Sequence, residues 1–228
     1  MVDVALIELE GVVFDTRAPR YEGLREAFIA QGLDVALVPD IVDGLAPRVA
    51  VVATLANASI PADDVLVDLL TVRAERAFSS RLAVGGVGLR PGARAFIQAA
   101  AGKARLASVT RANRTDADAM LRLAGLDTTF TIVVCADDTL DIKPAADGYE
   151  LALERLKRQR PFARGAVLAL EDGAPGIRAA RAANIRCAAV GPLPAHVAIE
   201  ADAYVPSLAG QTLASLDQLS RPGQERVQ

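Results

Sequence analysis

The sequence predicts an α/β protein with a parallel β-sheet core covered by helices and an all-helical insertion. Three observations carry this prediction. Short runs rich in Val, Ile, Leu and Ala recur along the chain, helical patterns separate the later runs, and one long stretch near the N-terminus holds helical patterns only. Strands that are apolar almost throughout are typical of a parallel sheet buried on both faces. Hydrophobic residues make up 52% of the 228 residues, which is enough for a sizeable core.

The expected strands are six apolar runs, and the expected helices follow from side-chain spacing. Ala117, Met120 and Leu121 recur at spacings of three and four, as on one face of a helix, and Gly125 is a natural stop. Right-handed crossovers bring the carboxyl ends of such strands to one edge of the sheet, where ligands bind. The expected strands are 4–9, 104–109, 130–135, 166–170, 186–190 and 203–205, and the helices between the later strands are 113–124, 147–158 and 174–184.

Residues 17–87 interrupt this alternation, because they show helical patterns and no convincing strand. The expected helices are 20–31, 47–58 and 62–82, and three glycines at 85, 86 and 88 suit a linker. We therefore expect a core domain made of residues 1–16 and 88–228. We expect residues 17–87 to form a helical cap domain, placed as a lid over the strand ends.

Composition excludes several classes of function. A net charge of -3 gives no electrostatic case for nucleic acid or an acidic membrane, and the lack of Trp disfavours base stacking. No run reaches the roughly 18 apolar residues of a membrane span, and the first residues lack the features of a signal peptide. The single His196 excludes a His-rich zinc site. Cys135 and Cys187 lie in apolar runs and are expected to be reduced, so a cytoplasmic location is predicted. Oligomeric state is not predicted.

Polar residues follow four of the expected strands directly, so the sheet would gather them at one edge. Four carboxylates at close range are costly unless a cation is bound or some are protonated. Oxygen ligands beside a lysine fit Mg²⁺ and a phosphate-bearing substrate. The residues are Glu8 and Glu10 after the first strand, Thr110 and Arg111 after the second, Lys143 after the third, and Glu171 and Asp172 after the fourth.

Each of these residues also has a purely structural interpretation. Glu10 and the following glycine could form only a turn, Thr110 could cap the next helix, and Asp172 could be the N-cap of 174–184. Lys143 could be an ordinary surface lysine. Their joint placement at successive strand ends favours a functional site, because capping and turns do not require one polar group for each strand.

Four motifs then resemble the haloacid dehalogenase (HAD) superfamily of phosphohydrolases. VALIELEGVVFDT resembles the first motif, an apolar strand followed by D-x-D-G-x-x-x-D-[ST], and LASVT ending at Thr110 resembles the second. IKPAADGY around Lys143 resembles the third, and LALEDGAPGIRAARAANIRCAAV around Asp172 resembles the fourth. The resemblance covers essentially the whole chain and looks closest to the branch of phosphoglycolate phosphatases and β-phosphoglucomutases. It implies a Rossmann-like core with an inserted helical cap.

The resemblance also implies roles for individual residues. Glu8 would be nucleophile and metal ligand, and Glu10 would be the general acid/base and lend its backbone carbonyl to the metal. Thr110, Arg111 and Lys143 would bind the substrate. Thr110 and Lys143 would also be catalytic residues, because they would hold the phosphoryl oxygens. Asp172, supported by Glu171, would complete the shell of a Mg²⁺ cofactor. The implied substrate is a small phosphorylated metabolite.

The chain departs from the family at the two first-motif aspartates, which are Glu8 and Glu10 here. Glutamate keeps the charge but adds one methylene, about 1.5 Å, and a shift of about 1 Å in a reacting group can cost on the order of 10²-fold in rate. Two hypotheses follow. The chain is a Mg²⁺-dependent phosphatase, or it is a catalytically impaired relative that binds a phosphorylated ligand or a protein partner without turnover.

Overall fold

The structure, a computed structural model, describes residues 1–38, 42 and 44–221, and the chain divides into two compact units. The first, called the core unit below, contains Met1–Asp15 and the chain from Leu89 onward. The second, called the helical unit, is Thr16–Gly88. The borders expected from the sequence lie one residue away from these. That the helical unit acts as a cap stays a prediction.

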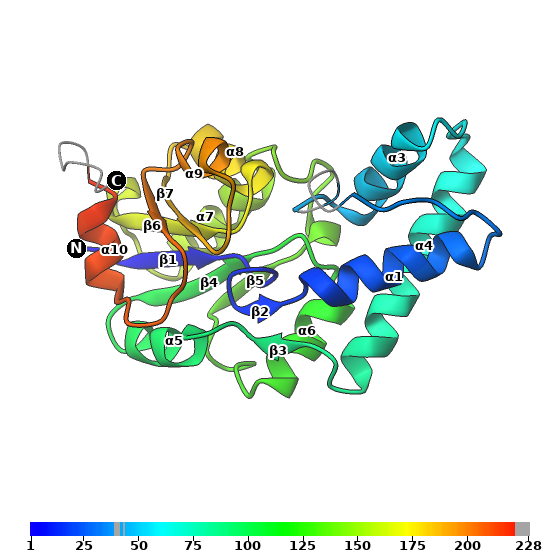
Figure 1. Cartoon of the computed structure of the whole chain (residues 1–228). Helices are drawn as coiled ribbons and strands as arrows, with labels where there is room; N and C mark the ends of the chain where they lie inside the picture. Colours follow the sequence, from blue (N-terminus) through cyan, green and yellow to red (C-terminus); the bar gives the residue numbers. More distant parts are fainter. Residues whose placement is uncertain (39–41, 43, 222–228) are drawn as a thin grey trace. The chain divides into compact units, whose positions relative to one another are not determined.

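The core unit is built on a six-stranded sheet in which all neighbouring strands run parallel (Figure 1). Most strand residues are buried, which explains their largely apolar composition. The strand order is β5-β4-β1-β6-β7-β8. The strands are β1 (Val4–Ile7), β4 (Arg105–Val109), β5 (Ile132–Val134), β6 (Val167–Glu171), β7 (Arg186–Val190) and β8 (Ala203–Val205). The predicted α/β fold with a parallel sheet is thereby confirmed.

Helices cover both faces of this sheet, with α5 and α6 on one side and α7 and α8 on the other (Figure 1). Met120 and Leu121 are buried on α6, and Asn113 caps this helix by accepting a 2.8 Å hydrogen bond from the Asp116 N–H. The helices are α5 (Ala93–Ala101), α6 (Arg114–Leu123), α7 (Asp147–Gln159), α8 (Ala174–Ala182), α9 (Ala195–Ala198) and α10 (Leu213–Leu219), with short 3₁₀ turns at Ala136–Asp138 and Arg164–Ala166.

The first strand, β1, lies in the middle of the sheet, between β4 and β6, and a tight loop follows it. Leu6 is level with Ala107 of β4 and Ala169 of β6. In the loop Gly11 has a φ of +76° and its N–H donates a 2.8 Å hydrogen bond to the Phe14 carbonyl. Two short strands, β2 (Phe14–Asp15) and β3 (Gly88–Leu89), then pair where the chain leaves and re-enters the core unit.

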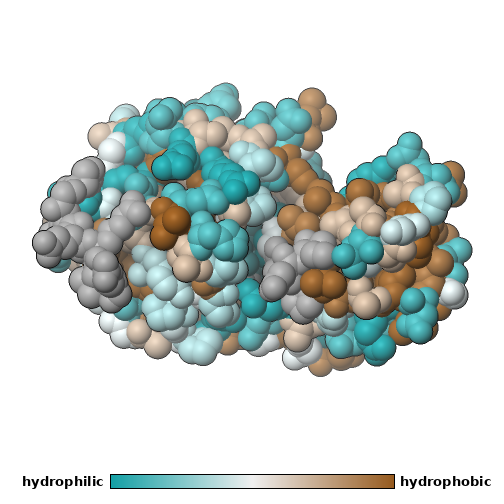
Figure 2. All heavy atoms as spheres, turned by 45° about the horizontal axis from the view of Figure 1, so that its top comes forward, coloured by the Kyte–Doolittle hydropathy of each residue, from teal (hydrophilic) through white to brown (hydrophobic). Residues whose placement is uncertain are grey.

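The helical unit contains α1 (Arg17–Ile29), α3 (Pro47–Asn57) and α4 (Asp64–Ala83), packed around a core of their own. Asp63 caps α4 by accepting a 2.8 Å hydrogen bond from the Leu66 N–H. Several large apolar side chains of this unit are exposed, Val65 and Val84 among them, and Figure 2 shows hydrophobic atoms over its surface. No helix in the described part of either unit is long and apolar enough to cross a membrane.

Both cysteines are buried free thiols, as expected from their apolar surroundings. Cys187 lies in β7 and Cys135 directly follows β5. Three strands, β4, β1 and β6, separate β5 from β7, so the two sulfurs are much too far apart to form a disulfide. Burial raises the pKa of Cys135 to about 12 and that of Cys187 well above its ordinary value.

Candidate active site

Glu8 follows β1 directly, and its carboxylate is the centre of the polar cluster. The side chain is 1% exposed. One carboxylate oxygen accepts hydrogen bonds from the Thr110 hydroxyl and the Glu10 N–H, and the other accepts from the Lys143 ammonium at 2.7 Å and the Arg111 N–H at 3.2 Å. Four donors from three separate segments therefore converge on one buried carboxylate, which explains how its charge is tolerated away from water.

Lys143 lies between two buried carboxylates, and its own side chain is only 10% exposed. Its ammonium donates to Glu8 at 2.7 Å, to Glu171 at 2.6 Å and to the carbonyl of Val109 at 2.7 Å, so all three protons are used. Burial lowers the pKa of Lys143, but the charges of Glu171 and Glu8 outweigh burial and raise this pKa to about 12. Lys143 is thus charged at neutral pH.

Glu171 is the last residue of β6 and is 1% exposed. It accepts hydrogen bonds from Lys143 and from the hydroxyl of Tyr149, a buried residue of α7. The backbone of Gly176 on α8 lies so close that a Cβ there would overlap the Glu171 carboxyl group. Burial raises the pKa of Glu171 to about 7, and Lys143 opposes this rise. Glu171 is therefore held inside the protein by contacts from three directions.

Asp172 and Arg111 form a second ion pair beside the first. The Arg111 guanidinium donates to the Asp172 carboxylate at 3.0 Å, and the two side chains are 16% and 12% exposed. Asp172 also packs on the loop after β1, because a Cβ at Gly11 would overlap its carboxylate. Burial raises the pKa of Asp172, and the charge of Arg111 opposes this rise.

Glu10 is the second acidic residue of the loop after β1, and it is 1% exposed. Its N–H donates to the Glu8 carboxylate at 3.1 Å, and its backbone forms a bridge with Phe14. Its negative charge also acts on the Arg111 guanidinium, because it is one of the charges that raise the pKa of Arg111.

The structure thus brings the predicted site residues into one connected cluster at the carboxyl ends of β1, β4 and β6. The structural alternatives for three of them are wrong. Asn113, not Thr110, caps α6, and Gly173, not Asp172, occupies the N-cap of α8. The Lys143 side chain is only 10% exposed and is bonded to two buried carboxylates, unlike that of a surface lysine. The catalytic and substrate-binding roles expected for these residues stay predictions.

The arrangement of the carboxylates does not by itself fit a metal site. No group of three or more His, Cys, Asp or Glu side chains within the described residues is placed to hold a metal ion. Glu8 and Glu171 share Lys143, and Asp172 is bonded to Arg111. The oxygen donors expected for Mg²⁺ are present, but Lys143 and Arg111 already form ion pairs with these carboxylates. The expected set of Glu8, Glu10 and Asp172 as ligands stays a prediction.

Two residues of the cluster were not expected from the sequence. Tyr149 falls within the expected helix 147–158, and its hydroxyl is the signal that could have found it, because a buried tyrosine hydroxyl needs a hydrogen-bond partner. Gly176 gave no signal at all, because its role depends on how closely α8 approaches β6.

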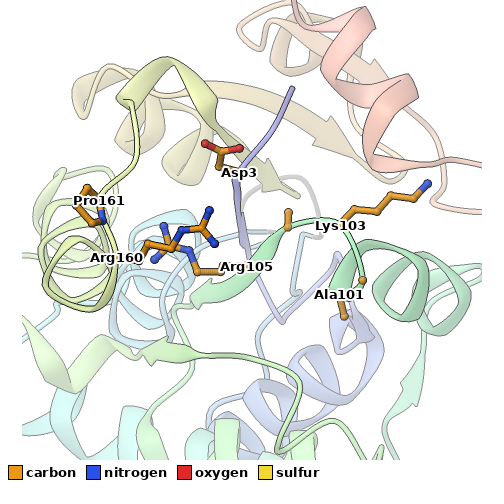
Figure 3. Close-up of a pocket in the computed structure, with 8 residues that line it drawn as sticks. Asp3, Ala101, Lys103, Arg105, Arg160 and Pro161 are labelled. Atoms are coloured by element: carbon orange, nitrogen blue, oxygen red, sulfur yellow. The ribbon is translucent and has the colours of Figure 1, made fainter.

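A hollow of about 290 Å³ lies at the opposite end of the strands. Figure 3 shows Asp3, Lys103, Arg105 and Arg160 around it. Asp3 precedes β1 and Arg105 begins β4, so this hollow is at the amino ends of the strands. It contains none of the predicted site residues.

Residues 9–184 match the model of the haloacid dehalogenase-like hydrolases. The chain is similar to Protein CbbY of Rhodobacter capsulatus, with 30% identity over 192 residues, which is 79% of this chain and 82% of the relative. It is 28% identical to Protein CbbY of Cereibacter sphaeroides over 82% of this chain and 83% of that protein.

Solved structures support the same fold. CbbY from Rhodobacter sphaeroides, in complex with phosphate, has a TM-score of 0.81 at 24% identity and covers 95% of this chain and 100% of its own. A β-phosphoglucomutase from Clostridium difficile has a TM-score of 0.81 at 15% identity, with 96% and 97% covered. Four ordered motifs, a six-stranded parallel core and the match over residues 9–184 agree, and the chain belongs to the haloacid dehalogenase-like hydrolases.

Proposed function

We propose that this chain hydrolyses the phosphate ester of a small phosphorylated sugar. The observation that carries the proposal is the group formed by Glu8, Thr110 and Lys143 at the carboxyl ends of the strands. It combines a buried carboxylate with a hydroxyl and a charged ammonium, each of which donates a hydrogen bond to that carboxylate. Phosphoryl transfer needs a positioned nucleophile and positive charge close to the transferring group, and this group supplies both.

The proposed reaction follows the roles that the family resemblance assigns. A carboxylate oxygen of Glu8 attacks phosphorus, the ester P–O bond breaks, and Glu10 gives a proton to the leaving alcohol. Water, deprotonated by Glu10, then attacks phosphorus and releases phosphate from Glu8. Thr110 and Lys143 hold phosphoryl oxygens, and Arg111 contributes a further donor to the substrate.

The substrate class rests on the relatives. A mutant of CbbY from Rhodobacter sphaeroides was crystallised in complex with xylulose-(1,5)bisphosphate, and this protein is 24% identical to our chain. A small sugar mono- or bisphosphate is therefore the first substrate class to test. Mutase activity is less favoured, because the stretch from Arg20 to Leu24 lacks the histidine that mutases of this branch carry after the first motif.

HAD hydrolases generally use Mg²⁺, and the resemblance assigns its ligation to Glu8, Glu10 and Asp172. Mg²⁺ dependence is part of the proposed function. No step of the reaction is assigned to the ion, because Glu8, Glu10 and Asp172 do not form a group that could hold a metal in the described structure. A cytoplasmic location also belongs to the proposal, because two buried free thiols suit a reducing compartment.

A second candidate function is binding of a phosphorylated ligand without turnover. The observation that favours it is the state of the Glu8 carboxylate, both of whose oxygens are already bonded to protein donors. A nucleophile must give up such bonds to reach phosphorus in line, whereas a ligand-binding carboxylate need not.

Phosphate release from a panel of sugar phosphates and an aryl phosphate, with Mg²⁺ or with EDTA, separates the two functions. If the chain is a phosphatase, Glu8→Gln lowers the rate of phosphate release by about 10³-fold or more. The matched control Glu154→Gln, at an exposed position of α7, keeps the wild-type rate. No release from any substrate, together with thermal stabilisation by one of them, identifies the binding protein instead.

A further inference from the structure

Arg111 is the second cation of the acidic cluster, and its position differs from that of a surface arginine. Its side chain is 16% exposed, and its guanidinium lies 3.0 Å from the Asp172 carboxylate, which is 12% exposed. Surface ion pairs contribute little because water screens them, but this pair is mostly shielded from water. Removing one partner would leave the other charge buried without compensation.

Asp172 packs closely on the loop after β1. Its carboxylate packs against the backbone of Gly11 so closely that even a methyl group there would overlap it. Gly11 itself has a positive φ of 76°, so the loop after β1 holds its shape only with glycine at this point. The carboxylate of Asp172 thus lies beside the loop that carries Glu10, and the Arg111 guanidinium is bonded to it.

The two cations of the cluster divide the four acidic residues between them. Lys143 bonds Glu8 and Glu171. Arg111 bonds Asp172 and lies within reach of the charges of the other acids, because Asp172, Glu10, Glu8 and Glu171 together outweigh burial and raise the pKa of Arg111. Arg111 therefore occupies the position where the cluster would otherwise need a bound cation.

We propose that Arg111 is the resident cation of this site and takes the place on Asp172 that a metal ion would need. A guanidinium is always charged at physiological pH, and this one is tethered to the chain, so it competes with a free ion at a high effective concentration. The wild-type site then binds Mg²⁺ weakly, and the acids stay neutralised without it. This proposal rests on the site of the proposed function, but it does not require that the site turns over a substrate. Its test therefore measures ion binding alone.

The test measures binding of Mn²⁺, as a probe for Mg²⁺, by water proton relaxation, and the melting temperature with and without Mg²⁺. Arg111→Ala exposes Asp172 to the ion, so we expect it to bind Mn²⁺ at least about tenfold more tightly than wild type and to melt higher in Mg²⁺. Arg111→Lys restores a cation and returns binding toward the wild-type value. Arg122→Ala, which removes an exposed arginine of α6 that donates to the Asp118 carbonyl of its own helix, leaves binding unchanged.

Adding Asp172→Asn to Arg111→Ala removes the gain, which locates the ion on Asp172. The proposal is overturned if Arg111→Ala folds and gains no affinity. It is also overturned if wild type binds Mn²⁺ tenfold more tightly than the single variant Asp172→Asn. If Arg111→Ala is unfolded alone, recovery of its circular dichroism on adding Mg²⁺ supports the proposal. If the circular dichroism does not recover, the Mn²⁺ affinities of wild type and Asp172→Asn decide whether the proposal holds.

Discussion

Replacing Lys143 by methionine should destabilise the core unit strongly, because methionine keeps most of the length of the side chain but not its ammonium charge. The ammonium donates to Glu8, Glu171 and the Val109 carbonyl at 2.6–2.7 Å. Both carboxylates are 1% exposed, so neither can turn to water for a replacement. Removing one partner of a buried ion pair costs about 3–5 kcal/mol. For a chain of this size that corresponds to a fall in Tm of roughly 6–20 °C.

The assay is thermal and urea unfolding followed by circular dichroism at pH 7, with Lys103→Met as the matched control. Lys103 is exposed, and the change there should stay within about 0.5 kcal/mol of wild type. Adding Glu171→Gln to Lys143→Met should recover part of the loss, since it removes one of the two uncompensated charges. A Lys143→Met protein as stable as Lys103→Met would refute the argument that the ammonium neutralises this cluster.

The pH dependence of the same interaction has a defined sign. The pKa of Lys143 is raised to about 12, above its unfolded value of 10.5. Its contribution is therefore complete below about pH 10 and is lost as pH rises through 12. Alkaline unfolding of wild type should begin at higher pH than that of a variant in which Glu171→Gln has weakened the pair.

Three further outcomes are expected. Gly176→Ala should lower stability by about 1–3 kcal/mol in urea unfolding, because its methyl group would overlap the Glu171 carboxyl group, and a neutral result would mean that α8 shifts freely. Burial raises the pKa of Asp217, but hydrogen bonds from Arg221 and Arg186 outweigh burial and leave it below 3.8. Its stabilisation is present above about pH 4 and is lost as pH falls. The free energy of unfolding of Asp217→Asn should therefore fall less than that of wild type as the pH is lowered below about 4. Glu8→Asp should raise phosphate release if the extra methylene limits the chemistry, whereas a fall would identify glutamate as the fitted group.

The pattern of apolar residues was sufficient to predict the sheet, because strand and helix periods are local properties of the chain. The strands at 186–190 and 203–205 match the predicted ranges, and Pro47 begins a helix as predicted. The helix Ala93–Ala101 was not predicted. Its sequence does carry the helical signal, because its buried residues Ala93, Phe96, Ile97 and Ala100 recur at spacings of three and four. The helix Leu213–Leu219 has only seven residues, too few for a period to stand out.

The candidate site was predictable as a set of residues but not as a set of contacts. Strand ends place Glu8, Thr110 and Asp172 at one edge regardless of side-chain detail. Which cation meets which acid depends on the directions that side chains take from loops, and periodicity does not determine these. The pairing of Arg111 with Asp172, and the hydroxyl that Tyr149 directs at Glu171, emerge only once the loops and helices have packed.

The central position of β1 has a consequence for how the chain folds. Its partners on either side are β4 and β6, whose residues follow it by roughly 100 and 160 positions, so the pairing spans most of the sequence. Without β1 the sheet would fall into two halves, one of β5 and β4 and one of β6, β7 and β8. Contacts of such long range slow folding, because the loop must be closed before they form. Glu8 and Glu10 arrive on this same segment, so the step that joins the two halves also assembles the acidic cluster, and a chain stalled before that step would have neither.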